Sequence, residues 1–217
     1  MRLFLSSQDL GNYGKVAAKL AGNNKRAAFI KNAQDFKSLQ ERNFSTPDKK
    51  TMFLEAGFDY FEEIDLRSYF GESAKLLNKL SNFGSIWCAG GNTFILRRAM
   101  KASGLDEILK QLLADDKALY GGWSAGAMIM SPSLQGADWG EEDRPDLIPE
   151  GYDQHQRSIW EGLNQVSFYI VPHVGNPEFG NGPQKTIDYF ESHNLPYKIL
   201  RDGQVIVVDG EKVEFLK

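Results

Sequence analysis

The sequence predicts an α/β fold: a mostly parallel central sheet with helices on both faces and a small β-hairpin at the C-terminal end. Short apolar runs of strand length alternate with longer segments whose apolar residues recur at helical spacing. This rhythm is typical of a parallel sheet, because each crossover between parallel strands needs a connection of helix length. The final two apolar runs flank Asp209-Gly210, which favours a hairpin turn. No repeat or linker divides the 217 residues, so we expect one domain over residues 1–217.

The expected elements follow from local patterns along the chain. Strands are expected where polar residues or glycines bound an apolar run, at 3–5, 27–30, 60–66, 85–89, 118–120, 166–171, 197–200, 204–208 and 212–216. Helices are expected where apolar residues lie three and four positions apart, at 13–21, 46–56, 73–80, 93–103, 105–113 and 183–192. The polar stretch 35–47 is expected to be an exposed loop or frayed helix. The charged stretch 131–159 is expected to be a long loop of functional importance or disorder.

Net charge, apolar run lengths and cysteine content exclude several classes of function. The formal net charge is −4 and no basic run is present, which argues against a nucleic-acid partner. No apolar run approaches the ~20 residues that cross a bilayer, so no membrane partner is expected. The single cysteine, Cys88, excludes an internal disulfide and suits a reducing compartment, and we expect a cytoplasmic protein. No His/Cys/Asp cluster has metal-ligand spacing, so neither a metal nor another cofactor is expected.

The most informative stretch is Tyr120-Gly-Gly-Trp-Ser-Ala-Gly-Ala-Met128. Ser124 lies between Gly122 and Gly126, the Gly-x-Ser-x-Gly spacing of a nucleophile elbow between a strand and a helix. The glycines let the backbone turn tightly, and the serine hydroxyl then projects beyond the end of the sheet. Ser124 is therefore the candidate nucleophile.

A serine needs a base to take its proton, and the usual base is a histidine held by a carboxylate. His173 follows an apolar strand and a proline, whereas His155 and His193 lie in polar segments that favour solvent-exposed roles. His173 is therefore the candidate base.

A carboxylate is expected between the nucleophile and the histidine if the chain order is Ser, acid, His. Asp138 is favoured because it follows small residues soon after the elbow, and Glu141 and Glu142 remain alternatives.

Acyl transfer also requires hydrogen-bond donors for the oxyanion. The backbone N–H groups of Ala125, directly after the nucleophile, and of Gly91, in a glycine pair, are the candidates. The glycine pair, Ser124 and His173 each follow an expected strand. We expect them to gather at one edge of the sheet, where ligands bind.

Three segments, Cys88-Ala-Gly-Gly-Asn-Thr-Phe94, Gly122-Trp-Ser-Ala-Gly-Ala127 and Val171-Pro-His173, resemble the peptidase E (aspartyl dipeptidase) family of serine peptidases. The resemblance extends over nearly the whole chain. It implies a flavodoxin-like fold similar to the class I glutamine amidotransferase domain, and a cytoplasmic, metal-independent enzyme with a small peptide substrate. On matching positions it implies Ser124 as nucleophile, His173 as base, and Gly91 and Ala125 as the oxyanion hole.

Two features depart from the family pattern. The segment between the elbow and the histidine is longer, and Lys185 stands where the aspartyl dipeptidases carry an arginine that reads the substrate aspartate. The ammonium group of lysine cannot bind a carboxylate through two parallel hydrogen bonds as an arginine guanidinium does. A small peptide without an N-terminal Asp is therefore an alternative substrate to one with it. A non-peptide amide or ester hydrolase and an inactive binding module on the same fold are further alternatives. The oligomeric state, including a homodimer, is left open.

Overall fold

A seven-stranded sheet forms the centre of the computed structural model, which describes residues 1–44 and 46–217. Its strands lie in the order β3-β2-β4-β5-β1-β8-β9. In chain order they are β1 (Arg2–Ser6), β2 (Arg26–Ile30), β3 (Tyr60–Glu63), β4 (Ser85–Cys88), β5 (Leu119–Trp123), β8 (Val205–Asp209) and β9 (Lys212–Leu216). The first five in the sheet are parallel, whereas β8 runs antiparallel to β1 and pairs with β9. The expected fold class and terminal hairpin are confirmed.

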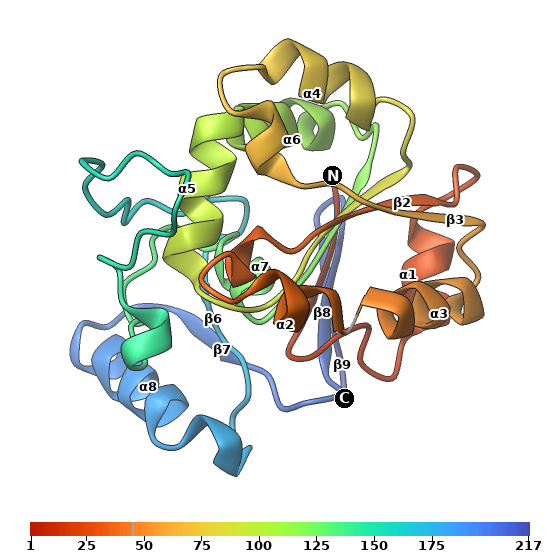
Figure 1. Ribbon diagram of the computed structural model, residues 1–217. Coiled ribbons are helices and arrows are strands. Elements are labelled where there is room, and N and C mark those ends of the chain that lie inside the picture. The colour runs from red at the N-terminus through yellow and green to blue at the C-terminus, as the bar shows by residue number, and fades with distance from the viewer. Residues whose placement is uncertain (45) are drawn as a thin grey trace.

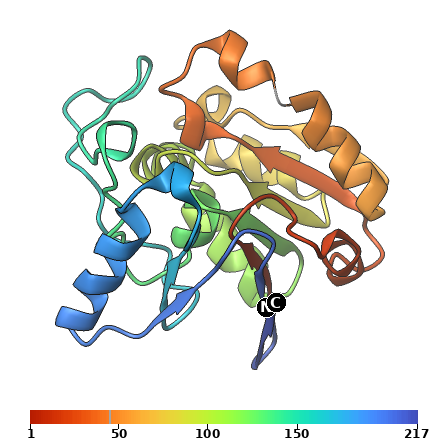
Figure 2. The same ribbon diagram turned by 90° about the horizontal axis from the view of Figure 1, so that it is seen from below.

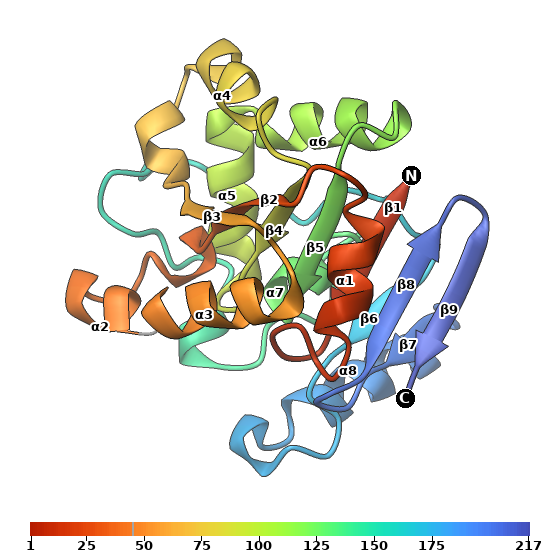
Figure 3. The same ribbon diagram turned by 90° about the vertical axis from the view of Figure 1, so that its right-hand side faces the viewer.

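The described residues form helices that cover both faces of this sheet or lie beside it (Figure 1). They are α1 (Gly14–Leu20), α2 (Leu39–Phe44), α3 (Thr46–Ala56), α4 (Ser73–Leu80), α5 (Thr93–Ser103), α6 (Leu105–Ala114), α7 (Ala125–Met128) and α8 (Gly182–Ser192). Helices α1 and α3 lie on one side of the sheet, and α4, α5 and α6 lie on the other (Figures 1 and 3). Part of the stretch expected as a loop or frayed helix at 35–47 forms α2; residue 45 of that stretch lies outside the described residues.

Two hydrophobic cores follow from the alternation of side chains along the strands. Leu3 and Leu5 of β1 face the core with α4, α5 and α6, whereas Phe4 between them faces the core with α1 and α3. Both faces of the central strands are buried, as expected for a parallel sheet covered by helices.

Polar caps set two element boundaries. The strand expected at 60–66 ends at Glu63, because the Asp65 side chain accepts a hydrogen bond from the Arg67 N–H and begins a short 3-10 turn, η2 (Leu66–Tyr69). Asn92 caps α5 by accepting hydrogen bonds from two backbone N–H groups, at 2.8 and 2.9 Å.

One expectation about the sheet is wrong. The strand before His173, β6 (Tyr169–Val171), does not join the central sheet but pairs with β7 (Tyr197–Ile199) in a separate two-stranded parallel sheet. Figures 1 and 2 show this pair and α8 lying beside the central sheet. The apolar pattern of β6 identified a buried strand. Tyr169 and Val171 pack with Phe190 of α8, whereas Ile170 between them packs into the core of the central sheet.

Within the described residues, no helix is both long and apolar enough to cross a bilayer.

Candidate active site

A pocket of about 370 Å³ opens at the edge of the sheet where β1, β2, β4 and β5 end. Residues that follow each of these strands form its wall: Asp9, Lys31, Gly90 and Ser124. His173 reaches the same pocket from the smaller sheet. The carboxyl ends of parallel strands are where α/β sheets bind ligands, so this pocket is the candidate active site.

Ser124 has the strained backbone of a nucleophile elbow. Its φ of 51° and ψ of −117° lie outside the conformations that ordinary residues favour. A Cβ at Gly122 would lie 2.3 Å from the carbonyl oxygen of Gly126, and one at Gly126 would lie 2.1 Å from that of Cys88. Only glycines therefore fit on either side of the turn, which agrees with the Gly-x-Ser-x-Gly spacing.

His173 is held from two directions. The ring Nδ1 lies 2.7 Å from Oδ1 of Asp202, and the backbone N–H donates to the Ser7 hydroxyl at 2.8 Å. The Ser7 hydroxyl in turn donates to Asp202 at 2.7 Å, and the Asn176 amide donates to the other carboxylate oxygen at 2.7 Å. The backbone of His173 has a φ of 60°, which these contacts maintain.

The carboxylate of Asp202 decides which nitrogen of the ring carries the proton. Burial alone would raise the pKa of Asp202, but hydrogen bonds from Ser7, Asn176 and His173 outweigh it and leave the pKa below its usual value. Asp202 is therefore ionised at neutral pH and accepts from Nδ1–H. In the neutral imidazole, Nε2 is then the acceptor.

Burial lowers the pKa of His173, and the hydrogen bond and charge of Asp202 oppose that effect without cancelling it. The ring is therefore neutral at pH 7. Its Nε2 is buried and has no hydrogen-bond partner among the described residues. A neutral acceptor nitrogen at a pocket wall is suited to taking a proton from a bound group.

The glycine loop after β4 lies directly against Ser124. A Cβ placed on Gly90 would be 2.9 Å from the Cβ of Ser124, and one on Gly91 would be 2.5 Å from the carbonyl oxygen of Ala33. Gly91 has a φ of 138°, a conformation that only glycine adopts readily. Within the described part of the chain, the N–H groups of Gly91 and Ala125 make no hydrogen bond. Both are free to serve a ligand.

Comparisons with known proteins agree with this geometry. The model of peptidase family S51 matches residues 6–216. The chain belongs to peptidase family S51. It is 32% identical to an uncharacterized peptidase from Pasteurella multocida over 97% of this chain and 94% of that protein. It is 28% identical to peptidase E from Streptomyces coelicolor, over 69% of this chain and 58% of that protein.

A solved structure from Listeria monocytogenes, assigned to peptidase E, superposes with a TM-score of 0.73 at 25% identity. The match covers 99% of this chain and 96% of that one. Family membership makes the protein a serine-type peptidase. The expected family and the expected enzyme class are therefore confirmed.

In this S51 peptidase, four of the five residues expected at the site gather around the pocket. Ser124, His173 and Gly91 line it, and Ala125 directly follows Ser124. The fifth, Asp138, makes no hydrogen bond to His173 in the described residues. The ring of His173 contacts Asp202 instead. Of the alternatives to Asp138, Glu142 lines the pocket and Glu141 does not.

Asp202, the carboxylate that contacts His173, follows the histidine in the chain, whereas the expected order Ser, acid, His placed the carboxylate before it. Asp202 lies in the turn before β8, and β8 runs antiparallel to β1. The start of β8 therefore lies beside the end of β1, at the edge where the pocket opens. An acidic residue just before the first strand of the expected hairpin was the available signal.

The cationic groups of this S51 peptidase also differ from the expected pattern. Lys185 is not among the described residues that line the pocket, whereas Lys31, Lys37 and Lys49 are. Lys31 forms an ion pair with Glu63, and Lys49 forms an ion pair with Asp9. Among the described residues, no group of three or more His, Cys, Asp or Glu side chains is placed to hold a metal ion.

Proposed function

We propose that this S51 peptidase hydrolyses short peptides through an acyl-enzyme on Ser124, with His173 as general base and Asp202 as the carboxylate that orients it. The observation that carries the proposal is a buried histidine that lines the same pocket as Ser124, with its Nδ1 bonded to Asp202 and its Nε2 without a hydrogen-bond partner in the described residues. Asp202 takes the role that the sequence assigned to Asp138.

The reaction follows from these roles. Nε2 of His173 takes the hydroxyl proton of Ser124 as Oγ attacks the peptide carbonyl carbon. The carbonyl oxygen becomes negatively charged, and the N–H groups of Gly91 and Ala125 stabilise it. The C–N bond then breaks as His173 gives the proton to the leaving amine. Water attacks the resulting ester by the same steps and releases the acid.

Ser124 and His173 are not hydrogen-bonded to one another in the described structure. Neither Ser124 Oγ nor His173 Nε2 has a hydrogen-bond partner among the described residues. Catalytic hydrogen bonds are often loose before substrate binds, and they tighten in the Michaelis complex. The two groups line one pocket, so a bound substrate carbonyl would meet both.

The pocket favours short peptides with a free N-terminus. A volume of about 370 Å³ is at the small end of ligand pockets and suits two or three residues. The acidic residues Glu142 and Asp143 line its rim, and they suit a positively charged α-amino group. The Asn92 amide fixes this rim by donating to the backbone carbonyls of Glu142 and Arg144, at 2.8 and 3.1 Å.

The direct test compares the wild type with Ser124→Ala on a panel of dipeptides and tripeptides, each with a free and an acetylated N-terminus. We expect turnover of free peptides, a preference over the acetylated forms, and loss of at least about 10³-fold in kcat in the variant. Ser81→Ala, at an exposed serine, is the matched control. Undiminished turnover in Ser124→Ala would refute the mechanism. A wild type that turns over none of these peptides, but hydrolyses esters or non-peptide amides added to the panel, would refute the substrate class alone.

A further inference from the structure

The peptide unit between Gly90 and Gly91 supplies one of the two oxyanion donors. In a trans peptide the C=O and N–H groups point in opposite directions, and the described residues contain no cis peptide. Whatever holds the Gly90 carbonyl oxygen therefore also sets the direction of the Gly91 N–H. A rotation of this unit would replace a donor with an acceptor at the oxyanion position.

Gln34 holds that carbonyl. Its side-chain Nε2 donates to the Gly90 oxygen at 3.0 Å. Gln34 is partly buried and lines the active-site pocket, and it belongs to the 3-10 turn η1 (Asn32–Gln34) that follows β2. Because the carbonyl is turned toward Gln34, the Gly91 N–H points away from Gln34. This N–H has no hydrogen-bond partner in the described structure.

The glycine pair needs such an external contact. Gly91 has a φ of 138° and neither glycine has a side chain, so the backbone itself does little to prevent rotation of the peptide unit. The unit that follows Gly91 is held by the same turn, because the Asn92 N–H donates to the Ala33 carbonyl at 2.8 Å. The η1 turn thus holds the peptide units on both sides of Gly91.

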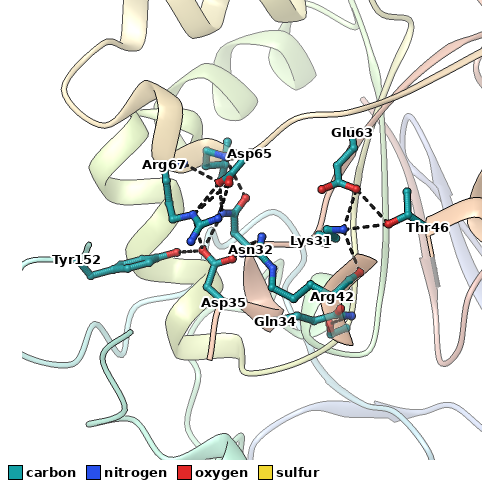
Figure 4. Close-up of polar contacts among 12 residues, drawn as sticks. Lys31, Asn32, Gln34, Asp35, Arg42, Thr46, Glu63, Asp65, Arg67 and Tyr152 are labelled. Atoms are coloured by element: carbon teal, nitrogen blue, oxygen red, sulfur yellow. Dashed lines mark hydrogen bonds and ion pairs between the residues drawn. The ribbon is translucent and has the colours of Figure 1, made fainter. Parts of the chain in front are cut away.

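The η1 turn is itself anchored by a buried polar network (Figure 4). Asp35, directly after the turn, forms an ion pair with Arg42 at 2.7 Å and accepts a hydrogen bond from the Tyr152 hydroxyl. Asn32 donates to Asp35 at 2.8 Å and to Asp65 at 2.9 Å. Hydrogen bonds and ion pairs are stronger when they are buried from water, so these contacts hold the backbone of the turn in place.

We propose that Gln34 is a positioning residue that keeps the Gly91 N–H directed at the oxyanion. The inference rests on the proposed function, because it assigns Gln34 a part in the same acyl transfer. Gln34 makes no hydrogen bond to Ser124 or His173 in the described residues. It acts through the Gly90–Gly91 peptide unit.

Two variants and one control test the proposal. Gln34→Met keeps the length of the side chain and removes the donor. Gln34→Glu keeps the shape and turns an acceptor toward the Gly90 carbonyl. Gln111→Met changes an exposed glutamine on α6 and serves as the matched control. The measurement is the second-order rate constant for labelling Ser124 with a fluorophosphonate, which also develops charge on an oxygen, across a range of pH and together with the melting temperature.

We expect both Gln34 variants to label about 10- to 100-fold more slowly, somewhat less than the 10²–10³-fold lost when an oxyanion donor is removed outright. The melting temperature and the acidic limb of the Gln34→Met profile should match those of the wild type, since His173 is untouched. In Gln34→Glu the deficit should shrink as the pH falls and the carboxyl group gains a proton to donate. Gln111→Met should behave as the wild type.

The outcomes separate the inference from the proposed function. Wild-type protein that does not label would overturn the proposed function and the inference together. Labelling of the wild type and both Gln34 variants at equal rates would overturn the inference and leave the proposed function in place. If Gln34→Met fails to fold, the pH dependence of Gln34→Glu decides: a deficit that is absent, or that is the same at every pH, rejects the role of Gln34.

Discussion

The phenyl ring of Phe179 lies flat against the imidazole of His173, with ring centroids 3.7 Å apart and an interplanar angle of 6°. Trp139 meets both rings edge-on, at 6.4 and 6.0 Å. Phe179 ends the 3-10 turn η4 (Pro177–Phe179). This turn begins next to Asn176, whose side-chain amide donates a hydrogen bond to Asp202. The stack excludes water from one face of the imidazole and fixes its plane, so that Nδ1 remains directed at Asp202.

Removing the stack should change the pH dependence of the peptidase. Burial is the main cause of the lowered pKa of His173, so Phe179→Ala should raise that pKa towards its ordinary value. A general base works in its neutral form, and the acidic limb of the kcat/KM profile should therefore move to higher pH. The looser ring should also lower kcat by about 10- to 100-fold.

Phe215→Ala, at an exposed phenylalanine of β9, is the control for this experiment and should leave the acidic limb in place. An acidic limb at the same pH in Phe179→Ala and the wild type would contradict the role of the stack.

Asp202 and Asp138 offer a direct comparison between the two assignments of the carboxylate. Asp202→Asn should lower kcat by about 10³–10⁴-fold, because the amide no longer favours the productive tautomer of His173. Asp138→Asn should change kcat by less than about 3-fold, since no hydrogen bond links Asp138 to the ring in the described structure. Steady-state kinetics on one peptide are sufficient. The opposite ranking would support the carboxylate favoured by the sequence.

Asp143 should make the folded state less stable as the pH rises. Burial, followed by the charges of Glu142 and Asp138, raises the pKa of Asp143 from 3.8 to about 6. The folded protein then holds this proton more tightly than the unfolded chain. Its contribution to stability is present below pH 3.8 and is lost as the pH rises to about 6.

Asp143→Asn removes this penalty. The free energy of unfolding at pH 7.5 should rise by about 1–2 kcal/mol relative to the wild type, with little difference between the two proteins at pH ~3.5, below the ordinary pKa. Urea unfolding at both pH values measures the effect. An equal difference at the two pH values would show that the carboxylate does not titrate as described.

The ion pair of Asp35 and Arg42 should be essential for stability. The Asp35 side chain is fully buried, and Arg42 is 3% exposed. Asp35→Ala leaves the Arg42 guanidinium buried without its carboxylate partner. This substitution should lower the free energy of unfolding by about 3–5 kcal/mol. Asp115→Ala breaks an exposed pair with Lys117 and should cost less than about 1 kcal/mol. Similar losses in the two variants, measured by urea unfolding, would contradict the buried character of the pair.

Much of the fold could be predicted from the sequence, as could the elbow and the glycine loop beside the pocket, because their signals are local. The elbow around Ser124 needs glycines two positions to either side, and the loop after β4 needs a glycine at position 91 with its φ of 138°. Both requirements are visible within a few residues of the sequence. The terminal hairpin is also local, since one short turn joins its strands.

The remainder depends on contacts between distant segments. Asp202 meets His173 only because β8 lies antiparallel against β1, a pairing of residues about 200 positions apart that no short pattern reveals. The apolar run of β6 indicates burial but not which sheet provides it. Gln34 lies in a polar stretch, and its contact with Gly90 depends on the parallel pairing of β2 with β4.

The most direct measurement is intact-protein mass spectrometry after reaction with a fluorophosphonate, with peptide mapping of the adduct. The peptidase should gain one phosphonyl group, at Ser124, and the Ser124→Ala variant should gain none. Labelling should weaken as the pH falls and His173 becomes protonated. An unmodified wild-type protein, or an adduct that persists in Ser124→Ala, would contradict Ser124 as the nucleophile.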